Sequence, residues 1–361
     1  MSRPIRFVLI AGPTASGKSA LALALARRLG SAVVNADASQ VYADLRILTA
    51  RPGAGEAGET RHELYGHVDA AEPYAVGRWL SDVHSVLNSL RTGADAIYPQ
   101  PGGRPAQAHQ SANVPIIVGG TGLYFEGLTR GLVDIPEIPE DIRAKWRAAA
   151  PADLHPELAR RDPVMAARLR PSDPQRLARA LEVLDATGRS LADWQQDLAA
   201  PLIDPEDALR MVLSPERAAL RERIARRLDA MIGEGAVEEA ARLDARGLDP
   251  ALPAMKALGV RPFAAARRGD LTLDEAVERT RLATGRYAKR QSTWFRNRMA
   301  DWLHVAPEEA LDVALREIEE RGIAEPTNRH PGRRVSAEPG SQAGQGDLPD
   351  DDPGSRCARP G

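Results

Sequence analysis

The chain of 361 residues has little cysteine, few aromatic side chains and no long apolar run. Its single cysteine, Cys357, stands in a polar C-terminal stretch, which excludes a disulfide framework and is typical of a reducing cytoplasmic setting. No apolar run approaches the roughly 20 residues that a membrane-spanning helix requires, so we expect a cytoplasmic protein without a membrane partner. The 48 Lys and Arg residues balance 50 Asp and Glu residues, so only a local cluster of charge can indicate a nucleic-acid partner.

A glycine-rich run near the N-terminus carries the most informative pattern in the sequence. It consists of Gly12, Pro13, Thr14, Ala15, Ser16, Gly17, Lys18 and Ser19, and it fits the phosphate-loop (P-loop) spacing. An apolar strand is predicted before it at 7–11 and a helix after it at 20–29. In this order the loop amides and the helix N-terminus bind a chain of phosphates. Lys18 adds positive charge, and the hydroxyl of Ser19 can bind Mg²⁺.

The order of the apolar runs predicts the fold class. Strand-like runs stand at 7–11, 32–36 and 115–118. Helical stretches at 20–29 and 76–90 lie between them, and this alternation predicts an α/β fold with a parallel sheet. The predicted organisation is a P-loop core at 1–138 and 206–322, a helical insertion at 139–205, a flexible loop insertion at 92–113 and a disordered C-terminal tail at 323–361.

A carboxylate and a glycine-rich turn follow two of the predicted strands. Asp37 comes directly after the strand at 32–36, and ligands of parallel sheets bind beyond the carboxyl ends of the strands. Asp37 is therefore a candidate magnesium ligand or proton acceptor, although an aspartate at such a turn commonly caps a helix. The strand at 115–118 leads into small residues, which suit either close approach of a substrate or a tight turn. A nucleotide-hydrolysing enzyme often has an aspartate at the end of such a strand to hold Mg²⁺. Its absence here weakens a kinase or ATPase interpretation.

Two basic helical faces are candidates for nucleic-acid binding. Gln175, Arg176 and Arg179 lie together, opposite the leucines of one predicted helix. The stretch 286–298 contains five cations and no acid, and at helical spacing one side carries Arg286, Lys289, Arg290, Thr293 and Arg296. Such a face binds phosphates and stacks bases when aromatic residues adjoin it, and the alternative is an ordinary solvated face. A further cationic pair, plausible for diphosphate contacts or as surface charge, is Arg217 and Arg221.

Together these segments resemble the bacterial tRNA dimethylallyltransferase (isopentenyltransferase) family over about residues 5–300. Besides the P-loop, the resemblance rests on Asp-Ala-Ser-Gln-Val-Tyr at 37–42, Thr-Ala-Arg-Pro at 49–52, and the segments 118–124, 173–183 and 287–295. The P-loop alone is generic, but the ordered set is specific.

The resemblance implies transfer of a dimethylallyl group from dimethylallyl diphosphate to the exocyclic amine of the adenosine 3′-adjacent to the anticodon. The P-loop would hold the diphosphate together with Mg²⁺ and Arg217, Asp37 would act as general base, and Thr121 would lie near the reacting centre. The partner would be the anticodon stem-loop of tRNA, which the helical insertion would grip, and the protein would be a monomer. The residues with implied tRNA contacts are Asp37, Ala38, Ser39, Gln40, Arg143, Gln175, Arg176, Arg179, Lys256, Arg261, Lys289, Arg290 and Arg296.

The sequence departs from the family pattern at four positions that concern RNA contacts, namely Ala38, Arg51, Val260 and Gly285.

Three other functions remain open on the residues alone. A P-loop small-molecule kinase would phosphorylate a metabolite with ATP and without RNA. A prenyltransferase of free adenine nucleotides would accept AMP or ADP. A non-catalytic RNA-binding protein is disfavoured because Lys18 and Ser19 are intact.

Overall fold

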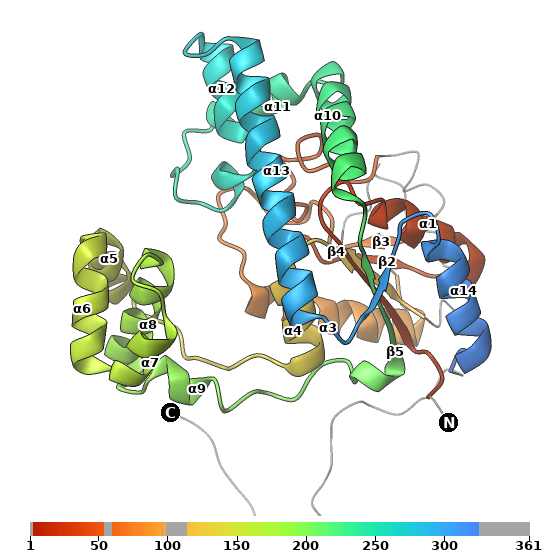
Figure 1. Ribbon diagram of the computed structural model, residues 1–361, viewed down its shortest axis with the longest axis horizontal. Helices are drawn as coiled ribbons and strands as arrows, with labels where there is room; N and C mark the ends of the chain where they lie inside the picture. Colours follow the sequence, from red (N-terminus) through yellow and green to blue (C-terminus); the bar gives the residue numbers. More distant parts are fainter. Residues whose placement is uncertain (1–2, 54–59, 96, 99–113, 325–361) are drawn as a thin grey trace, which may run out of the picture. The chain divides into compact units, whose positions relative to one another are not determined.

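A parallel sheet carries the P-loop at the end of a central strand (Figure 1). The computed structural model describes residues 3–53, 60–95, 97–98 and 114–324. Within these residues the strands lie in the order β3, β2, β4, β1, β5, β6, and every neighbouring pair is parallel. Their bounds are β1 (Phe7–Ala11), β2 (Val33–Asn35), β3 (His62–Glu63), β4 (Ile116–Gly119), β5 (Ala208–Leu213) and β6 (Leu303–Val305).

The helices of the core fall into two groups along the chain. The first group comprises α1 (Lys18–Leu29), α3 (Val76–Thr92) and α4 (Gly122–Arg130). The second comprises α10 (Arg217–Gly233), α11 (Ala236–Asp244), α12 (Val260–Arg268), α13 (Leu273–Arg298) and α14 (Ala310–Arg321), with short 3₁₀ helices η1 (Pro205–Asp207) and η2 (Ala254–Lys256). No helix in the described ranges is long and apolar enough to cross a membrane.

Both faces of the sheet are buried. Val8 and Ile10 of β1 belong to one apolar cluster, to which α1 and α14 contribute. Leu9 and Ala11 belong to another, to which α3 and α4 contribute. Because successive strand residues point to opposite faces, a central strand covered on both faces must be apolar throughout. The run at 7–11 is apolar for this reason, and it therefore positions the P-loop rigidly.

Residues 140–194 form helices with an apolar core of their own. They are α5 (Glu140–Ala148), α6 (Pro151–Arg161), α7 (Pro163–Arg168), α8 (Pro174–Thr187) and α9 (Leu191–Trp194). Trp146, Leu158 and Leu181 are buried in this core. The two connections that lead into and out of it pair with each other at Val133 and Leu198. All five helices fall within the range of the predicted insertion, whose standing as a domain stays a prediction.

The α/β fold class and the parallel sheet are confirmed, but the two edge strands were not predicted. Strand β3 has 2 residues and β6 has 3, which is too short for a recognisable apolar pattern. Each is specified by pairing with a longer neighbour, β3 with β2 and β6 with β5. This pairing is a tertiary contact that local sequence does not reveal.

Two predicted segment boundaries differ from the structure by a few residues. Ile323 pairs with Ile5, so the described fold continues past 322, where the tail was predicted to begin. Arg61 donates hydrogen bonds to the carbonyl oxygens of Ala94 and Asp95, so the first part of the predicted loop insertion is held on the fold. The rest of both predicted segments, at 99–113 and 325–361, lies outside the described residues.

A buried carboxylate fixes a loop that borders the P-loop. Glu239 of α11 is 4% exposed, and it accepts hydrogen bonds from the amides of Arg46, Ile47 and Leu48 at 2.9, 2.8 and 2.8 Å. Charge-assisted hydrogen bonds are about twice as strong as neutral ones. Because Arg46 lines the same cavity as the P-loop, Glu239 indirectly shapes that cavity.

We expect Glu239→Gln to lower the free energy of unfolding by about 2 kcal/mol, because an amide turns a donor toward at least one of the three N–H groups. Urea denaturation measures this change. Glu238→Gln, at the exposed neighbouring position, is the matched control and is expected to change stability by less than about 0.5 kcal/mol. Equal stability of the two variants would contradict the role given to Glu239.

Candidate functional site

The P-loop turns through left-handed backbone conformations. Ala15 and Gly17 have φ angles of 61° and 93°, and the Ser16 amide donates to the Pro13 carbonyl oxygen at 3.2 Å. Such a turn directs successive N–H groups toward one point at the N-terminus of α1, which makes a site for an anion. Gly17 adopts its conformation without strain because it has no Cβ.

Lys18 is the first residue of α1 and folds over this turn. Its Nζ donates to the carbonyl oxygen of Pro13 at 3.2 Å. Burial lowers the pKa of Lys18 to about 8, a shift that the negative charge of Asp37 opposes and the positive charge of Arg227 increases. A bound anion would favour the charged form of Lys18, so its pKa reports on the occupancy of the loop.

Two arginines of α10 also reach the P-loop. Arg227 donates to Oγ1 of Thr14 at 3.3 Å, and Arg223 donates to the carbonyl oxygen of Ser16 at 3.3 Å. They are four residues apart and therefore lie on the same face of the helix. Together with Lys18 they surround the loop with positive charge, which is the electrostatic requirement for holding a diphosphate.

Asp37 follows β2, and its carboxylate is oriented by contacts to one oxygen. Ser39 donates to Oδ1 from its amide at 3.0 Å and from its hydroxyl at 2.6 Å. Asn35 fixes the backbone of the turn, because its Oδ1 accepts from the Asp37 amide at 2.9 Å. The other oxygen, Oδ2, faces Gly120, where an added Cβ would lie 3.1 Å from it. The carboxyl ends of β2 and β4 thus meet at Asp37, as predicted for a parallel sheet.

Thr121 and Gly119 hold these two strand ends together. Oγ1 of Thr121, at the N-terminus of α4, accepts a hydrogen bond from the amide of Ala38 at 3.0 Å. A Cβ on Gly119 would lie 2.0 Å from the carbonyl oxygen of Ala36, so only glycine allows the strands to approach this closely. Thr121 therefore lies beside the turn that carries Asp37, and its place near the reacting centre stays a prediction.

Gly120 and Gly122 make room for side chains of α13. A Cβ on Gly120 would lie 2.4 Å from Nε2 of Gln291, and one on Gly122 would lie 2.1 Å from Nε1 of Trp294. The small residues after β4 therefore serve close packing within the protein. This packing role was not predicted from the sequence, and contact of these glycines with a substrate stays a prediction.

Buried aromatic side chains adjoin Asp37. Tyr124 stacks on Trp79 with ring centroids 4.4 Å apart. The pKa values of Tyr124 and Tyr287 are raised, mainly by burial and further by the negative charge of Asp37. The Tyr124 hydroxyl and Nε1 of Trp294 are buried and have no hydrogen-bond partner among the residues described. Tyr124 therefore offers a donor near Asp37 that the protein itself does not use, and Trp294 offers another beside Gly122.

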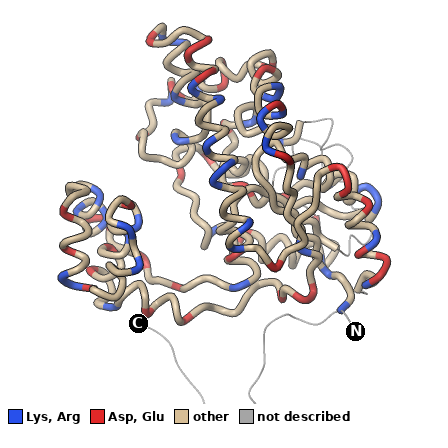
Figure 2. Tube along the Cα trace, in the orientation of Figure 1, with Lys and Arg blue, Asp and Glu red and all other residues tan. Residues whose placement is uncertain are grey.

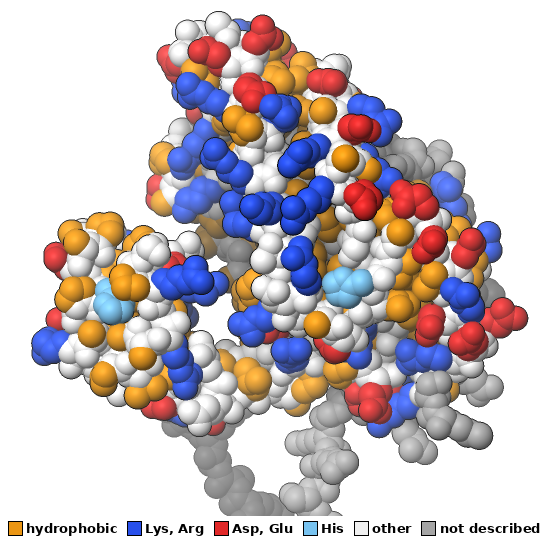
Figure 3. Space-filling view, viewed as in Figure 1, with side chains coloured by type: hydrophobic (Ala, Val, Ile, Leu, Met, Phe, Trp, Pro, Cys, Tyr) orange, Lys and Arg blue, Asp and Glu red, His pale blue; other side chains and the backbone are white. Residues whose placement is uncertain are grey.

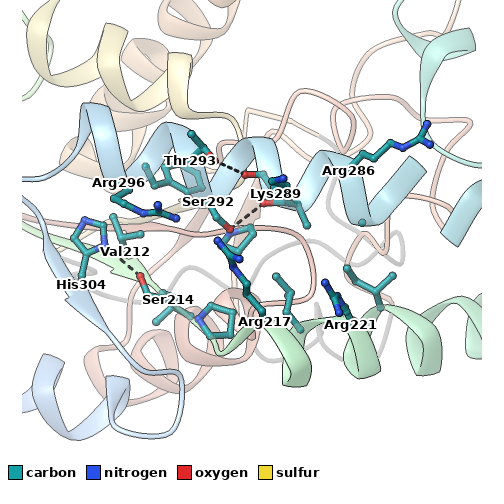
Figure 4. A pocket seen from close by; sticks show the side chains of 18 of the residues that line it. Val212, Ser214, Arg217, Arg221, Arg286, Lys289, Ser292, Thr293, Arg296 and His304 are labelled. Carbon is teal, nitrogen blue, oxygen red and sulfur yellow. Dashed lines mark hydrogen bonds between the residues drawn. The ribbon is translucent and has the colours of Figure 1, made fainter. Parts of the chain in front are cut away.

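A cavity of about 670 Å³ lies between α10 and α13 and reaches the P-loop at Pro13 (Figure 4). We call it the cationic cleft, after its charged lining residues Arg217, Arg221, Arg281, Arg286, Lys289 and Arg296. No acidic residue lines it, and only Arg281 forms an ion pair in the described part of the chain, with Glu278. Figure 4 shows Arg217 extending from α10 toward Lys289 and Ser292 of α13.

The charge of the cleft belongs to a wider basic surface. Lys and Arg recur along α13 in Figure 2, and Figure 3 shows their side chains gathered over this helix. Arg286, Lys289, Thr293 and Arg296 line the cleft together. Arg290, which the helical spacing groups with them, does not line the cleft, and its guanidinium lies 5.6 Å from the centroid of the Tyr287 ring. Uncompensated positive charge in a cleft attracts anions of high charge density.

The other residues with implied tRNA contacts are spread over the surface. On the helical segment, Gln175 and Arg176 are exposed, and Arg179 and Arg143 approach Glu182 and Glu140 at 3.4 and 3.9 Å. Outside the helical segment, Lys256 is the last residue of η2, and Arg261 donates to the carbonyl oxygen of Pro250 at 2.8 Å.

Three further residues with implied tRNA contacts lie in the turn after β2. Gln40 donates to the carbonyl oxygen of Thr49 at 2.9 Å. The amide of Ala38 donates to Thr121, and the hydroxyl of Ser39 donates to Asp37.

Sequence reasoning missed Arg223 and Arg227. The resemblance implied that Arg217 helps the P-loop to hold the diphosphate. Arg217 lines the cationic cleft, whereas the hydrogen bonds from α10 to the P-loop come from Arg223 and Arg227. A signal was present, because Arg223 and Arg227 each border a buried position of α10, at Ile224 and Leu228. A cation beside the buried stripe of a helix lies where it can reach a neighbouring element.

Ser19 is the residue with which the loop would hold a metal ion. It is exposed and lines a cavity of about 960 Å³ with Lys18, Arg223 and Arg227. The described residues contain no group of three or more His, Cys, Asp or Glu side chains that could bind a metal. A single hydroxyl beside an anion site fits Mg²⁺, which takes most of its ligands from phosphate oxygens and water.

Comparison with known proteins identifies the family to which the chain belongs. The IPP transferase family model matches residues 40–298, and the isopentenyl transferase model matches residues 5–66. A tRNA dimethylallyltransferase of Methylocella silvestris is 50% identical over 85% of this chain and 97% of its own. One of a Bradyrhizobium species is 50% identical over 84% of this chain and 95% of its own.

Solved structures of this family have a similar fold. The tRNA isopentenylpyrophosphate transferase of Bacillus halodurans is 30% identical, with a TM-score of 0.57 over 88% of this chain and 97% of that one. A eukaryotic dimethylallyltransferase that acts on tRNA shares the fold, with a TM-score of 0.71 over 89% of this chain and 81% of that one at 24% identity. The chain therefore belongs to the IPP transferase family, the family of the tRNA dimethylallyltransferases.

Proposed function

We propose that the protein transfers a dimethylallyl group from dimethylallyl diphosphate to the exocyclic amine of the adenosine 3′-adjacent to the anticodon in tRNA. One observation carries this proposal, namely that Oδ2 of Asp37 faces the junction where the P-loop and the end of β4 meet. A donor held by the loop and an acceptor held by the carboxylate would be neighbours there. The names of the relatives support the same reaction class.

The donor end of this site is the P-loop with its three cations. The amides of residues 15 and 17–19 would bind the diphosphate, and Lys18, Arg223 and Arg227 would stabilise the charge that builds up as it leaves. Mg²⁺, held by Ser19 together with diphosphate oxygens and water, would neutralise part of that charge when bound. Arg217 is the first residue of α10 and lines the cationic cleft together with Pro13. It would therefore contact the donor only where the cleft reaches the P-loop at Pro13.

The acceptor end is Asp37 with the aromatic walls around it. The amine nitrogen of the adenosine forms a bond to C1 of the dimethylallyl group, and the C1–O bond breaks with its electron pair leaving on the diphosphate. The proton that the nitrogen loses goes to Oδ2 of Asp37, whose other oxygen is held by Ser39. Thr121 keeps Ala38, and with it the carboxylate, in place.

The RNA would lie on the basic surface of α13 and on the helical segment. The target base must leave its stack to reach Asp37, which costs a few kcal/mol that phosphate contacts have to offset. The unpaired cations of the cationic cleft supply such contacts, and Gln175, Arg176 and Arg179 would grip the anticodon stem. A monomeric state and a cytoplasmic location stay predictions.

We expect Asp37→Asn to lower kcat by a factor of at least 100, because the isosteric amide cannot accept the proton. The assay is transfer of radiolabelled dimethylallyl groups to unmodified tRNA, followed by nucleoside analysis, with tRNA affinity measured in parallel. Affinity is expected to change less than about twofold. Asp69→Asn, at an exposed aspartate, is the control. A turnover close to that of the wild type would exclude Asp37 as the base, and phosphorylation of a metabolite by ATP would favour a kinase.

The affinity for inorganic pyrophosphate is expected to fall as pH rises above 8. Lys18 is fully charged well below its pKa of about 8 and loses its charge above it, while a bound anion favours the charged form. If pyrophosphate binds only the charged form of Lys18, its dissociation constant is expected to be roughly eightfold higher at pH 9 than at pH 7.5. Titration calorimetry without divalent ions measures it, and Lys18→Arg, which stays charged, corrects for ionisation of pyrophosphate. Parallel pH profiles for both proteins would contradict a role for Lys18.

We expect Lys289→Gln to weaken tRNA binding and to make its salt dependence shallower. Each phosphate contact contributes about 0.7–0.9 to the slope of log K against log salt concentration. Filter binding at a series of salt concentrations measures the slope. Arg268→Gln, which removes a cation paired with Asp244 and Asp270, is the matched control and leaves the slope unchanged. An unaltered slope in Lys289→Gln would show that the cationic cleft does not bind RNA phosphates.

A further inference from the structure

One side chain of α13 connects the P-loop to the end of β4. Gln291 is 6% exposed, and its Oε1 accepts a hydrogen bond from the amide of Thr14 at 2.9 Å. Its Nε2 donates to the carbonyl oxygen of Gly120 at 2.8 Å. Both partners are backbone groups, so the side chain fixes the relative position of two loops that belong to different strands.

The space that Gln291 fills is the point at which donor and acceptor ends meet. An added Cβ on Gly120 would lie 2.4 Å from Nε2 of Gln291 and 3.1 Å from Oδ2 of Asp37, so the amide and the carboxylate are neighbours. Thr14, the other partner, also receives the guanidinium of Arg227 on its hydroxyl. The carboxamide therefore touches the loop of the donor end and borders the carboxylate of the acceptor end.

The chemistry of this position requires a glutamine. A carboxamide has one acceptor and one pair of donors, which matches the free N–H of Thr14 on one side and the carbonyl oxygen of Gly120 on the other. Glutamate lacks the donor, methionine lacks both groups at similar volume, and asparagine is one methylene shorter. A merely space-filling residue would not need this complementarity.

We infer that Gln291 is a positioning residue for group transfer, which holds the P-loop and the Asp37 carboxylate at the separation that the reaction requires. The inference rests on the proposed function and adds to it a residue whose implied role was RNA contact through its segment. Group transfer depends steeply on this separation, because a displacement of about 1 Å can cost a factor of 100 in rate.

The position of Gln291 on α13 also links this junction to the basic surface. Lys289 and Thr293 line the cationic cleft, while Gln291 is buried and does not line it. A helix in this position has one side for RNA and the other for the reacting groups. Gln291 therefore connects α13 to both Thr14 and Gly120.

The experiment compares Gln291→Met and Gln291→Glu with the wild-type protein in the dimethylallyl transfer assay. Gln291→Met keeps the volume and loses both hydrogen bonds, and we expect kcat to fall between 10- and 100-fold. The affinity for tRNA is expected to change less than twofold. Rates are referred to the concentration of protein that binds tRNA, so a partly unfolded preparation does not imitate the effect.

Gln291→Glu tests separately whether the side chain at this position borders the Asp37 carboxylate. The new carboxylate lies beside Asp37, which Lys18, Arg227, Tyr124 and Tyr287 also face. A like charge disfavours the ionised base, so the acidic limb of the pH profile of kcat is expected to move to higher pH by about one unit. The profile of Gln291→Met is expected to keep the wild-type position.

Thr280→Val is the matched control, since it removes another buried polar group of α13, whose hydroxyl donates to the Ala276 carbonyl oxygen. It is expected to leave kcat and the pH profile unchanged. A kcat of Gln291→Met within threefold of the wild type, or an unshifted profile in Gln291→Glu, would overturn the inference. A wild-type protein that transfers no dimethylallyl group would instead overturn the proposed function.

Discussion

The meeting of three strand ends at one edge of the parallel sheet is the constraint on which the site depends. Strand β1 delivers the P-loop, β2 delivers Asp37, and β4 delivers the glycine-rich turn with Thr121. Neighbouring parallel strands place their carboxyl ends at the same edge, so these elements lie close together although they are far apart along the chain. Gly119 allows the backbones of β2 and β4 to touch, because any side chain there would collide with Ala36.

The distribution of charge around this edge suits a reaction in which an anion leaves. Lys18, Arg223 and Arg227 surround the loop, and the cations of the cationic cleft continue outward along α13. Asp37 is the negative charge that Lys18 and Arg227 both face. A single oriented carboxylate among cations can take up a proton from an incoming amine, while the cations stabilise the departing diphosphate.

Part of the candidate site was predictable from the sequence, and part was not. The P-loop was identified from its spacing of glycines, lysine and serine between a strand and a helix. Asp37 was identified because it follows an apolar strand, and ligands of parallel sheets bind beyond such strand ends. Arg223 and Arg227 were missed because their contact with the P-loop depends on how α10 packs, which local sequence does not encode. Gln291 was included only within a basic segment. Its helical spacing from Ala288 and Phe295 placed it on the buried side, and that signal was not used.

The central claim is that Oδ2 of Asp37 and the P-loop serve one reaction between them. A crystal structure with pyrophosphate and an unmodified anticodon stem-loop tests it most directly. We expect pyrophosphate on the amides of residues 15 and 17–19 and the exocyclic amine of the flipped adenine within about 3 Å of Oδ2. An adenine bound elsewhere, or pyrophosphate held away from the loop, would contradict the account.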